Sequence, residues 1–340
     1  MIEEVLPQIF RIEIPLPNNP LKALNAYLIK GNKRNLLIDT GFNQPECRAA
    51  MDAAINEAAI SMATTDILLT HAHSDHSGLV HHLATPTSRV FCDAYAAKYF
   101  EADQSQRWRN FNEMIAQSGL GDVRLSDHPG YTYATEPVEN VHIIKDGDTI
   151  SVGKFNLRCI STPGHAPDHI CLFEPERKIL FSGDHILGSI TPNNTIWVSP
   201  WTITRDLLGE YLHSLDKIAR LEIEITLPGH REIIRDCYRR IRELKDHHQQ
   251  RLIEIINVLG QKKMNGAQIA AKMQWRMRNR TWEEFPVTQK IFATGEALSH
   301  LTHLVFQKVL VKELFDGIVY YARPETCLID YPRSNRKDLD

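Results

Sequence analysis

The chain has 340 residues, of which 43% are hydrophobic and 24% are charged, and its formal net charge is −3. This composition is typical of an ordinary soluble globular protein, and so small a net charge indicates no particular class of partner. The length is ample for one two-layer domain and a smaller second domain. No apolar run approaches the roughly 18 residues that a membrane-spanning helix needs, so the sequence excludes such a segment.

The first part of the chain predicts three strands followed by a helix. A hairpin turn at Gly31 and Asn32 joins the second and third strands. In the motif LLIDTG, Asp39 stands at the end of the third strand, either as a plain turn residue or as a support for neighbouring ligands. The expected elements are strands at residues 8–14, 25–29 and 35–39 and a helix at residues 47–60.

Four potential metal ligands lie together in THAHSDHSG, residues 70–78, where an apolar strand turns into a helix. His71 and His73 are two residues apart, so in an extended segment they project to the same side and both imidazoles can reach one ion. Asp75 and His76 are adjacent in a tight loop and point elsewhere, which suits a second ion nearby. The alternative is a polar turn in which Asp75 caps the helix and the histidines face solvent.

Three further polar residues follow the ends of later strands. His165 lies in TPGHAPDH, a loop rich in turn-forming residues that follows a predicted strand at residues 155–160. Asp184 lies in SGDH at the end of a short apolar strand, behind the conformationally permissive Gly183. His230 lies in PGH after another apolar run. Because each of them follows a strand, one sheet edge can gather all of these side chains.

The ordered pattern HxHxDH, then H, then D, then H, resembles the metallo-β-lactamase superfamily of hydrolases over roughly residues 8–240. The resemblance implies that Asp39 supports the ligands and does not bind metal. It also implies two divalent ions, and imidazoles with few carboxylates favour zinc, although iron or manganese also fits. The implied ligands are His71, His73 and His165 for one ion, Asp75, His76 and His230 for the other, and Asp184 as the bridge.

The resemblance implies an α+β fold, the αβ/βα sandwich, with the metal site at one edge between two sheets. Within the superfamily, GHAPDHICLF, SGDHILG and the C-terminal segment look most like the glyoxalase-II-like hydrolases, in particular the branch of a lactamase-like endoribonuclease with a winged-helix tail. We therefore expect a catalytic domain over residues 1–240 and a smaller, α-helical winged-helix-like domain over residues 241–330.

Several other residues near the motifs are candidates for roles around the site. We expect His169 to support a ligand through a hydrogen bond, and His185 to play a similar indirect part. His81 and His82 are expected to lie outside the site. The segment after SGDHILG offers candidates for the rim of the site, although packing is the simpler interpretation: Asn193, Asn194, Trp197 and Trp201.

Residues 101–139 form a connection that is longer than usual and carries Trp108, Phe111, Tyr131 and Tyr133. Two interpretations are open for this segment. It is either a lid or substrate-facing insertion, or a segment whose aromatic side chains pack onto the sandwich.

The last third of the chain differs in composition, because residues 237–281 contain eleven Lys or Arg against three Asp or Glu. A long helix within residues 231–259, two further helices and a hairpin around Asp316 and Gly317 follow the order of a winged helix. Its basic face is either a nucleic-acid contact or the solvated face of a cap or dimer contact. We favour the cap, because aromatic residues are few and no recognition helix can be singled out.

The implied reaction is metal-assisted hydrolysis, in which a metal-bound hydroxide attacks the substrate and Asp75 takes up or relays a proton. We expect a small-molecule ester, thioester or lactone as substrate. The alternative is a ribonuclease-like phosphodiesterase acting on single-stranded RNA. A regulatory DNA-binding protein requires an inert site, against which the intact ligand set argues. The C-terminal region also offers surface for a homodimer.

The start of the chain, MIEEVLPQIFRIEIPLP, carries acidic residues where a secretion signal carries basic ones, so we expect a cytoplasmic protein. The charged end, residues 333–340, is expected to fray. The cysteines form no CxxC pair and are expected to be reduced and largely buried. They are Cys47, Cys92, Cys159, Cys171, Cys237 and Cys327.

Overall fold

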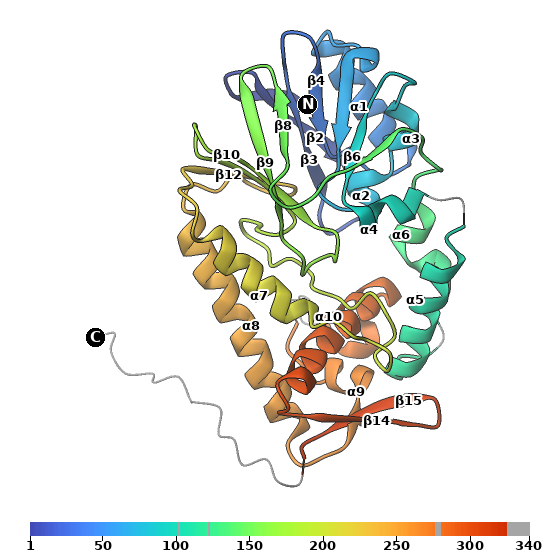
Figure 1. Ribbon diagram of the computed structural model, residues 1–340. Coiled ribbons are helices and arrows are strands. Elements are labelled where there is room, and N and C mark those ends of the chain that lie inside the picture. Colours follow the sequence, from blue (N-terminus) through green and yellow to red (C-terminus); the bar gives the residue numbers. More distant parts are fainter. Residues whose placement is uncertain (101–102, 122, 276–279, 325–340) are drawn as a thin grey trace.

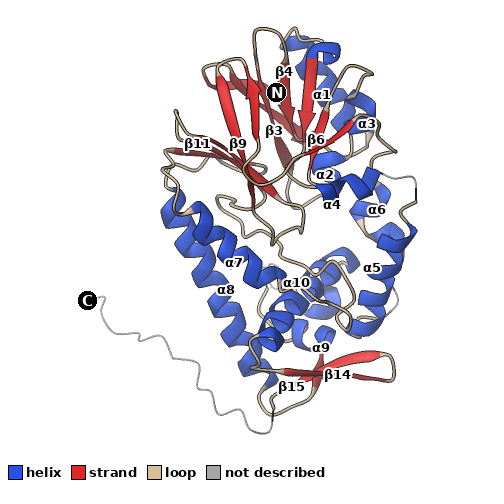
Figure 2. Ribbon diagram, in the orientation of Figure 1, coloured by secondary structure: helices blue, strands red, loops and turns tan. Residues whose placement is uncertain are grey.

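The computed structural model describes the whole chain except residues 101–102, 122, 276–279 and 325–340. Two β-sheets stack at one end of the molecule, and mostly helical elements occupy the other end (Figure 1). This arrangement of strands and helices (Figure 2) confirms the sandwich that the resemblance implied. Cys327 and the charged end at residues 333–340, for which the sequence made predictions, lie outside the described residues.

The first sheet has seven strands in sequence order, antiparallel from β1 to β4 and parallel from β4 to β7. Helix α1 (Pro45–Glu57), which begins with a proline in its first turn, carries the chain from β4 to β5 and buries Met51 on the outer face of the sheet. The expected strands are confirmed, and β1 was not predicted. The strands are β1 (Ile2–Leu6), β2 (Ile9–Pro15), β3 (Ala23–Ile29), β4 (Asn35–Ile38), β5 (Thr65–Leu68), β6 (Val90–Cys92) and β7 (Val141–Ile143).

The second sheet has five strands in the order β12-β11-β10-β9-β8, and only the pair β11 and β12 is parallel. Helix α7 (Leu207–Ile218) lies between β11 and β12 in the chain and covers the outer face of this sheet. The strands are β8 (Thr149–Val152), β9 (Phe155–Ser161), β10 (Ile170–Glu174), β11 (Ile179–Gly183) and β12 (Ile225–Pro228).

An apolar layer between the two sheets fixes how they stack. Tyr27 of β3 meets Phe181 of β11 edge to face, with ring centroids 5.4 Å apart. In β3, Tyr27 and Ile29 point into this layer, whereas Leu28 points to the helix-covered face. Both faces are buried, so apolar residues occupy both sides of the strand and do not simply alternate with polar ones. Each such large side chain contributes about 1.5–3 kcal/mol when buried.

The remaining helices of the first two thirds are short, apart from α5, which was not predicted. Helix α5 ends at Gly119, whose φ of +78° is the left-handed conformation that suits glycine. The helices are α2 (Ser74–Ser77), α3 (Val80–Leu83), α4 (Ala94–Ala97), α5 (Ser105–Ser118) and α6 (Pro129–Thr132), with 3-10 turns η1 (Met62–Thr64), η2 (Lys98–Phe100) and η3 (Leu125–Asp127).

The C-terminal region follows the expected order of helices and a hairpin, whose turn has positive φ at Asp316 and Gly317. A short strand, β13, also pairs with β15 and makes a three-stranded sheet. Asn265 begins α9 with a reciprocal capping box. The elements are α8 (Cys237–Leu259), β13 (Met264–Asn265), α9 (Gly266–Ala270), η4 (Trp282–Glu284), α10 (Val287–Phe306), β14 (Val311–Phe315) and β15 (Ile318–Ala322).

One hydrophobic cluster runs from the second sheet into the C-terminal helices. It includes Phe173 of β10, Leu208 of α7, Leu244 of α8 and Leu298 of α10. The boundary expected at residue 240 therefore crosses a shared core. The division into two domains stays a prediction, and we expect the regions on either side of it to unfold together.

Two simple expectations about the chain can be compared with the described residues. The five cysteines among them are buried free thiols, as expected. Within the same part of the chain, none of the helices is both long and apolar enough to cross a membrane.

Replacing Leu298 by alanine is expected to lower the free energy of unfolding by about 2–5 kcal/mol. The reason is that Leu298 is fully buried in the shared cluster. Urea denaturation followed by circular dichroism and fluorescence measures the change. Leu314→Ala, on the exposed strand β14, is the control and should change stability by less than about 0.5 kcal/mol. Two separate transitions, of which only one shifts, would contradict a shared core.

Candidate metal centre

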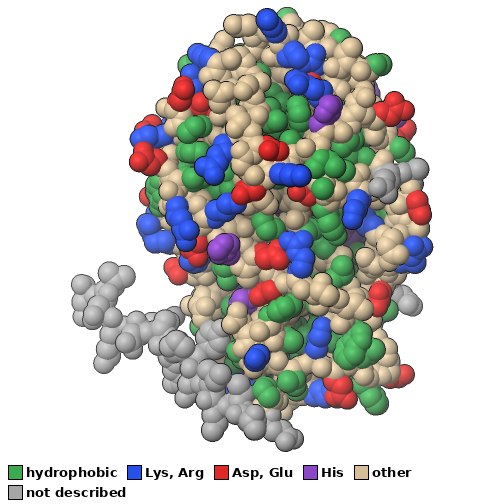
Figure 3. All heavy atoms as spheres, in the orientation of Figure 1, with side chains coloured by type: hydrophobic (Ala, Val, Ile, Leu, Met, Phe, Trp, Pro, Cys, Tyr) green, Lys and Arg blue, Asp and Glu red, His purple; other side chains and the backbone are tan. Residues whose placement is uncertain are grey.

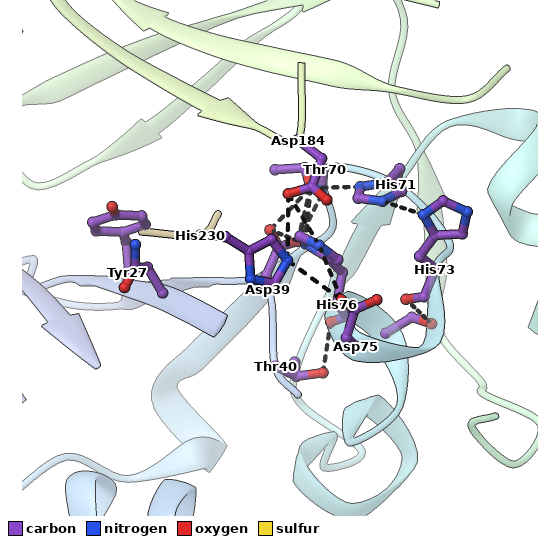
Figure 4. A network of polar contacts seen from close by, with 12 residues as sticks. Tyr27, Asp39, Thr40, Thr70, His71, His73, Asp75, His76, Asp184 and His230 are labelled. Atoms are coloured by element: carbon purple, nitrogen blue, oxygen red, sulfur yellow. Dashed lines mark hydrogen bonds and ion pairs between the residues drawn. The ribbon is translucent and has the colours of Figure 1, made fainter. Parts of the chain in front are cut away.

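The structure brings all seven predicted ligands to one edge between the two sheets. Figure 4 shows six of them, all except His165. The strands end there, as the sequence predicted. The first motif follows β5, His165 follows β9, Asp184 follows β11 and His230 follows β12. Residues that are up to 159 positions apart in sequence therefore share one buried cluster.

Three imidazole nitrogens surround a single point. His71 Nε2 lies 2.8 Å from His73 Nδ1 and 3.3 Å from His165 Nε2. The third separation, between His73 Nδ1 and His165 Nε2, is 2.9 Å. Nitrogen ligands about 2.0–2.1 Å from one zinc ion lie roughly this far from one another. These three nitrogens have the spacing of one metal site.

Asp75, His76 and His230 form a second group beside the first. Asp75 Oδ2 lies 3.3 Å from His230 Nε2 and 3.9 Å from His76 Nε2. The carboxylate of Asp184 stands between the two groups. Its Oδ1 is 3.4 Å from His76 Nε2 and 3.5 Å from His230 Nε2, whereas its Oδ2 is 3.7 Å from His165 Nε2.

The orientation of three of these imidazoles is fixed by hydrogen bonds on the side away from the cluster. The Nδ1–H group of His76 donates to Asp39 Oδ2 over 2.8 Å. That of His165 donates to the carbonyl of Asn193 over 2.8 Å, and that of His230 donates to the carbonyl of Ala23 over 2.6 Å. In the neutral form of each ring these acceptors hold the proton on Nδ1, so that Nε2 carries the lone pair and faces the cluster.

Several buried polar atoms in the cluster lack a hydrogen-bond partner among the described residues. They are His76 Nε2, His230 Nε2 and Asp184 Oδ1. A buried polar atom without a partner costs about 1–3 kcal/mol. A divalent cation would supply the missing partner for all three atoms, so the donor set fits the metal centre that the sequence predicted.

The electrostatics of the cluster also suit a cation. Burial, together with the neighbouring imidazoles, lowers the pKa of His71 well below its usual value, so that its ring is neutral and able to bind metal. Burial alone would raise the pKa of Asp184, but His230 and His76 hold it well below its ordinary value, so the carboxylate is charged.

Asp39 and His169 support the cluster from behind. Asp39 adopts a left-handed φ of +60° and accepts hydrogen bonds from the Thr70 backbone N–H at 2.9 Å and from His76. His169 Nε2 accepts the backbone N–H of Asp184 at 3.1 Å, and its Nδ1 bonds to Thr162 Oγ1 at 2.8 Å. Both residues therefore orient ligands through hydrogen bonds, as expected.

Two glycines are required for the close packing of this edge. Gly183, which precedes Asp184, has a φ of +47°, and a Cβ there would lie 2.7 Å from His169 Nε2. A Cβ at Gly229 would lie 2.8 Å from Asp184 Oδ1. A side chain at Gly183 would collide with His169, which supports Asp184, and one at Gly229 would collide with the Asp184 carboxylate itself.

The candidates for the rim of the site separate into two pairs. Trp197 stacks on His73 with ring centroids 4.9 Å apart and lines the adjoining cavity, as does Asn193. Asn194 is buried and donates to His248, while Trp201 is 44% exposed near Lys312. Only the first pair therefore faces the site.

The other histidines lie outside the cluster. His81 and His82 are exposed, and His82 pairs with Asp52 at 3.0 Å, as a surface residue does. His185 is fully buried and packs on Tyr211, with ring centroids 5.0 Å apart.

A cavity of about 440 Å³ extends from the cluster into the helical end of the molecule. His73, Asp75, His165 and Asp184 line one end of it. The walls are largely apolar and come from α5, from the loop before α7 and from α10, with Phe111, Met114, Ile196, Trp197 and Phe292 among them.

The long segment at residues 101–139 combines both of its possible roles. Trp108 and Phe111 line the cavity, whereas Tyr133 packs on Phe42 of the sandwich with ring centroids 5.0 Å apart. The contributions of α10 to the cavity were not identified from the sequence. Its apolar side chains have the same periodicity as any buried helix face, so no local signal distinguishes them.

A two-sheet sandwich with a His and Asp cluster at the edge between its sheets defines a class of metallohydrolases. The family model of the metallo-beta-lactamase superfamily matches residues 21–230, and the chain belongs to that superfamily. It is accordingly a hydrolase.

Curated relatives and solved structures agree with this assignment. The chain is 27% identical over 302 residues to the atrochrysone carboxyl ACP thioesterase of Aspergillus fumigatus, covering 86% of this chain and 79% of that protein. It is 30% identical over 222 residues to the acyl-coenzyme A thioesterase MBLAC2 of Homo sapiens, covering 61% of this chain and 72% of the relative.

Two solved structures match nearly the whole chain. A beta-lactamase domain protein from Burkholderia ambifaria superposes with a TM-score of 0.80 at 25% identity, covering 95% of this chain and 93% of that one. A metallo-beta-lactamase family protein from Thermus thermophilus has a TM-score of 0.77 at 27% identity, with coverage of 94% and 100%. The similarity therefore extends through the C-terminal helices.

Asp39→Asn is expected to weaken metal affinity by about 10–100-fold, because it removes the charged acceptor that orients His76. Competition with a chromophoric chelator measures the affinity. Asp52→Asn is the matched control, since among the described residues Asp52 pairs only with exposed His82. Equal metal affinities in the two variants would show that Asp39 does not support the centre.

Proposed function

We propose that this hydrolase cleaves acyl thioesters at a centre of two divalent metal ions. The observation that carries the proposal is the largely apolar cavity that ends on the His and Asp cluster. An acyl chain gains about 0.8 kcal/mol for each methylene that such a cavity removes from water. Thioesterase relatives with 27% and 30% identity support a thioester over an oxygen ester or lactone.

The proposed metal ligands are those that the resemblance implied, and the distances above support them. Zinc is the proposed metal, because five of the seven ligands are imidazoles, with iron and manganese as the alternatives. In this arrangement Asp184, whose two oxygens face the two groups, would hold both ions. The sets are His71, His73 and His165 for one ion and Asp75, His76 and His230 for the other.

Bound divalent ions would supply an activated water and polarise the substrate carbonyl. The side chains do the rest. Asp75 lines the cavity next to His230 and is placed to take up a proton and pass it to the leaving thiolate. Trp197 stacks on His73 and, with Phe111 and Met114, keeps bulk water from the acyl chain.

The C-terminal region is proposed to act as a cap, since α10 forms part of the cavity wall. Much of its basic excess is neutralised within the protein, where Lys245 pairs with Asp216 at 2.7 Å and Arg251 with Glu296 at 3.3 Å. On the face shown in Figure 3, acidic and basic side chains are interspersed. No observation favours the phosphodiesterase alternative, and a cytoplasmic location and a homodimer stay predictions.

The purified protein is expected to contain close to two divalent ions per chain. Asp184→Asn should lose part of that metal and lower kcat by about a hundredfold or more, since it removes the proposed bridge. Metal analysis and thioester turnover, with zinc, manganese and iron supplied separately, measure both effects. Asp216→Asn, on the surface of α7, is the control. One ion with undiminished activity in the Asp184 variant would refute the bridge.

The same assay decides between substrate classes. A panel of thioesters, oxygen esters and lactones is compared with single-stranded RNA under identical metal conditions. Turnover of RNA without turnover of any acyl substrate would refute the thioesterase proposal.

A larger side chain at Ala293 would fill part of the cavity, so we expect the protein to accept only shorter acyl chains. Ala293 of α10 is buried and lines the cavity. If Ala293→Leu excludes two methylenes, kcat/KM for a dodecanoyl thioester falls about tenfold while that for an acetyl thioester is unchanged. Ala53→Leu, at an exposed position of α1, is the control. An equal loss for both chain lengths would contradict the proposed acyl site.

A further inference from the structure

One cation on the wall of the cavity has no counter-ion among the residues that the structure describes. Arg107 of α5 is the one Lys or Arg among the described residues that line the cavity. Its side chain makes neither an ion pair nor a hydrogen bond with any residue that the structure describes. Its guanidinium carbon lies 4.4 Å from the ring centroid of Tyr99 and 4.8 Å from that of Trp108. The two aromatic rings hold the charge in place without neutralising it.

The acidic groups near Arg107 are engaged elsewhere. Asp75 and Asp184 belong to the metal centre, and Glu296 at another part of the cavity pairs with Arg251. Asp168 influences Arg107 electrostatically but lies beyond ion-pair distance, and it accepts the Ala72 backbone N–H at 2.7 Å. A half-buried guanidinium without a carboxylate partner is unusual, because buried charges are normally paired.

A second unused donor lies beside Arg107. His128 Nδ1 accepts the backbone N–H of Gly130 at 3.0 Å, so the proton of the neutral ring is on Nε2. Burial, with the charge of Arg107, lowers the pKa of His128 to about 4 and keeps the ring neutral. His128 also lines the cavity, and within the described part of the chain its Nε2–H has no acceptor.

Both donors, Arg107 and His128, contact Gly130, which is hydrogen-bonded to the loop that carries His73 and Asp75. A Cβ at Gly130 would lie 2.9 Å from His128 Nδ1 and 3.4 Å from Arg107 Nη2, so both side chains meet its backbone. Ser74 lies between the proposed ligands His73 and Asp75 in the sequence. Its Oγ donates a hydrogen bond to the Gly130 carbonyl over 3.1 Å. One small molecule can therefore reach the metal centre and both donors at once.

We propose that Arg107 and His128 bind a negatively charged group of the substrate, so that the preferred thioester carries a carboxylate or a phosphate. This inference rests on the proposed thioesterase function and adds a substrate class to it. An arginine presents paired N–H groups that match both anions, and His128 adds a neutral donor. The charge sits either on the acyl part or on the thiol part of the thioester.

Three thioesters with the same number of acyl carbons show whether the negative charge lies on the acyl part or on the thiol part of the preferred substrate. They are a neutral acyl-N-acetylcysteamine, its ω-carboxyacyl counterpart and the acyl-4′-phosphopantetheine. We expect the wild type to favour one of the two anionic substrates over the neutral one. Arg107→Gln should lower kcat/KM for that substrate about 10–100-fold, mainly through KM, and leave the neutral substrate unchanged. Arg107→Lys should recover part of the loss.

The control is Arg109→Gln, on the exposed side of the same helix, where Arg109 bonds only to Gln106 among the described residues. It should keep the wild-type preference. An equal loss for all three substrates in Arg107→Gln would mean that Arg107 only stabilises α5, and it would overturn the proposal. A wild type without preference for either anion would overturn it as well.

Binding separates this proposal from the thioesterase proposal. Uncleavable thioether analogues of the same three compounds report on the anion site even if no thioester is hydrolysed. Tryptophan fluorescence, to which Trp108 beside Arg107 contributes, measures their Kd values. Tighter binding of an anionic analogue that disappears in Arg107→Gln supports the anion site. Equal Kd values for the charged and neutral analogues would refute it, whatever the turnover.

Discussion

The site depends on hydrogen bonds that cross between the two sheets. His230 follows β12 in the second sheet, yet its ring is oriented by the carbonyl of Ala23 in β3 of the first. The same strand holds the chain before His230, since Tyr27 donates its O–H group to the Pro228 carbonyl at 2.9 Å and Asn25 donates to it at 3.1 Å. The stacking of the sheets therefore sets the position of His230, a proposed ligand. The apolar layer that holds the sheets together contributes both to stability and to the geometry of the site.

The elements and residues that the sequence predicted well are those whose signal is local. The spacing of His71 and His73 depends on a single extended segment, so the pattern alone indicates a shared ion. His165, Asp184 and His230 each follow an apolar run, and the end of such a run indicates where a strand ends. Strand β10 was missed because its apolar residues directly follow the motif that contains His165 and were interpreted together with that loop. Helix α5 was missed because its composition is mostly polar.

The rest of the site has no local signal. The acceptors for two histidines are backbone carbonyls at Ala23 and Asn193, and any residue type supplies a carbonyl. From the sequence, Arg107 resembles a solvated residue of a polar helix. Only the fold shows that it lines a cavity beside two aromatic rings, with no counter-ion in the described part of the chain. Phe292 is separated from the metal motifs by more than sixty residues of sequence, so its role in the cavity depends entirely on tertiary packing.

The His and Asp cluster and the cavity walls are built from different elements. This separation determines which substitutions each of them can tolerate. The cluster is built from strand ends, and its outer hydrogen bonds leave little freedom for substitution. The walls come from α5 and α10, and α10 also contributes Leu298 and Leu301 to the hydrophobic cluster shared with α8. Changes on the cavity side of α10 alter the shape of the proposed acyl site, whereas changes on its opposite side alter stability. Because both sides belong to one helix, a larger side chain at Ala293 that shifts α10 disturbs the core packing too, at a typical cost of about 1–3 kcal/mol. Under the proposed function, the packing of α10 therefore limits the substrate range more than the proposed metal ligands do.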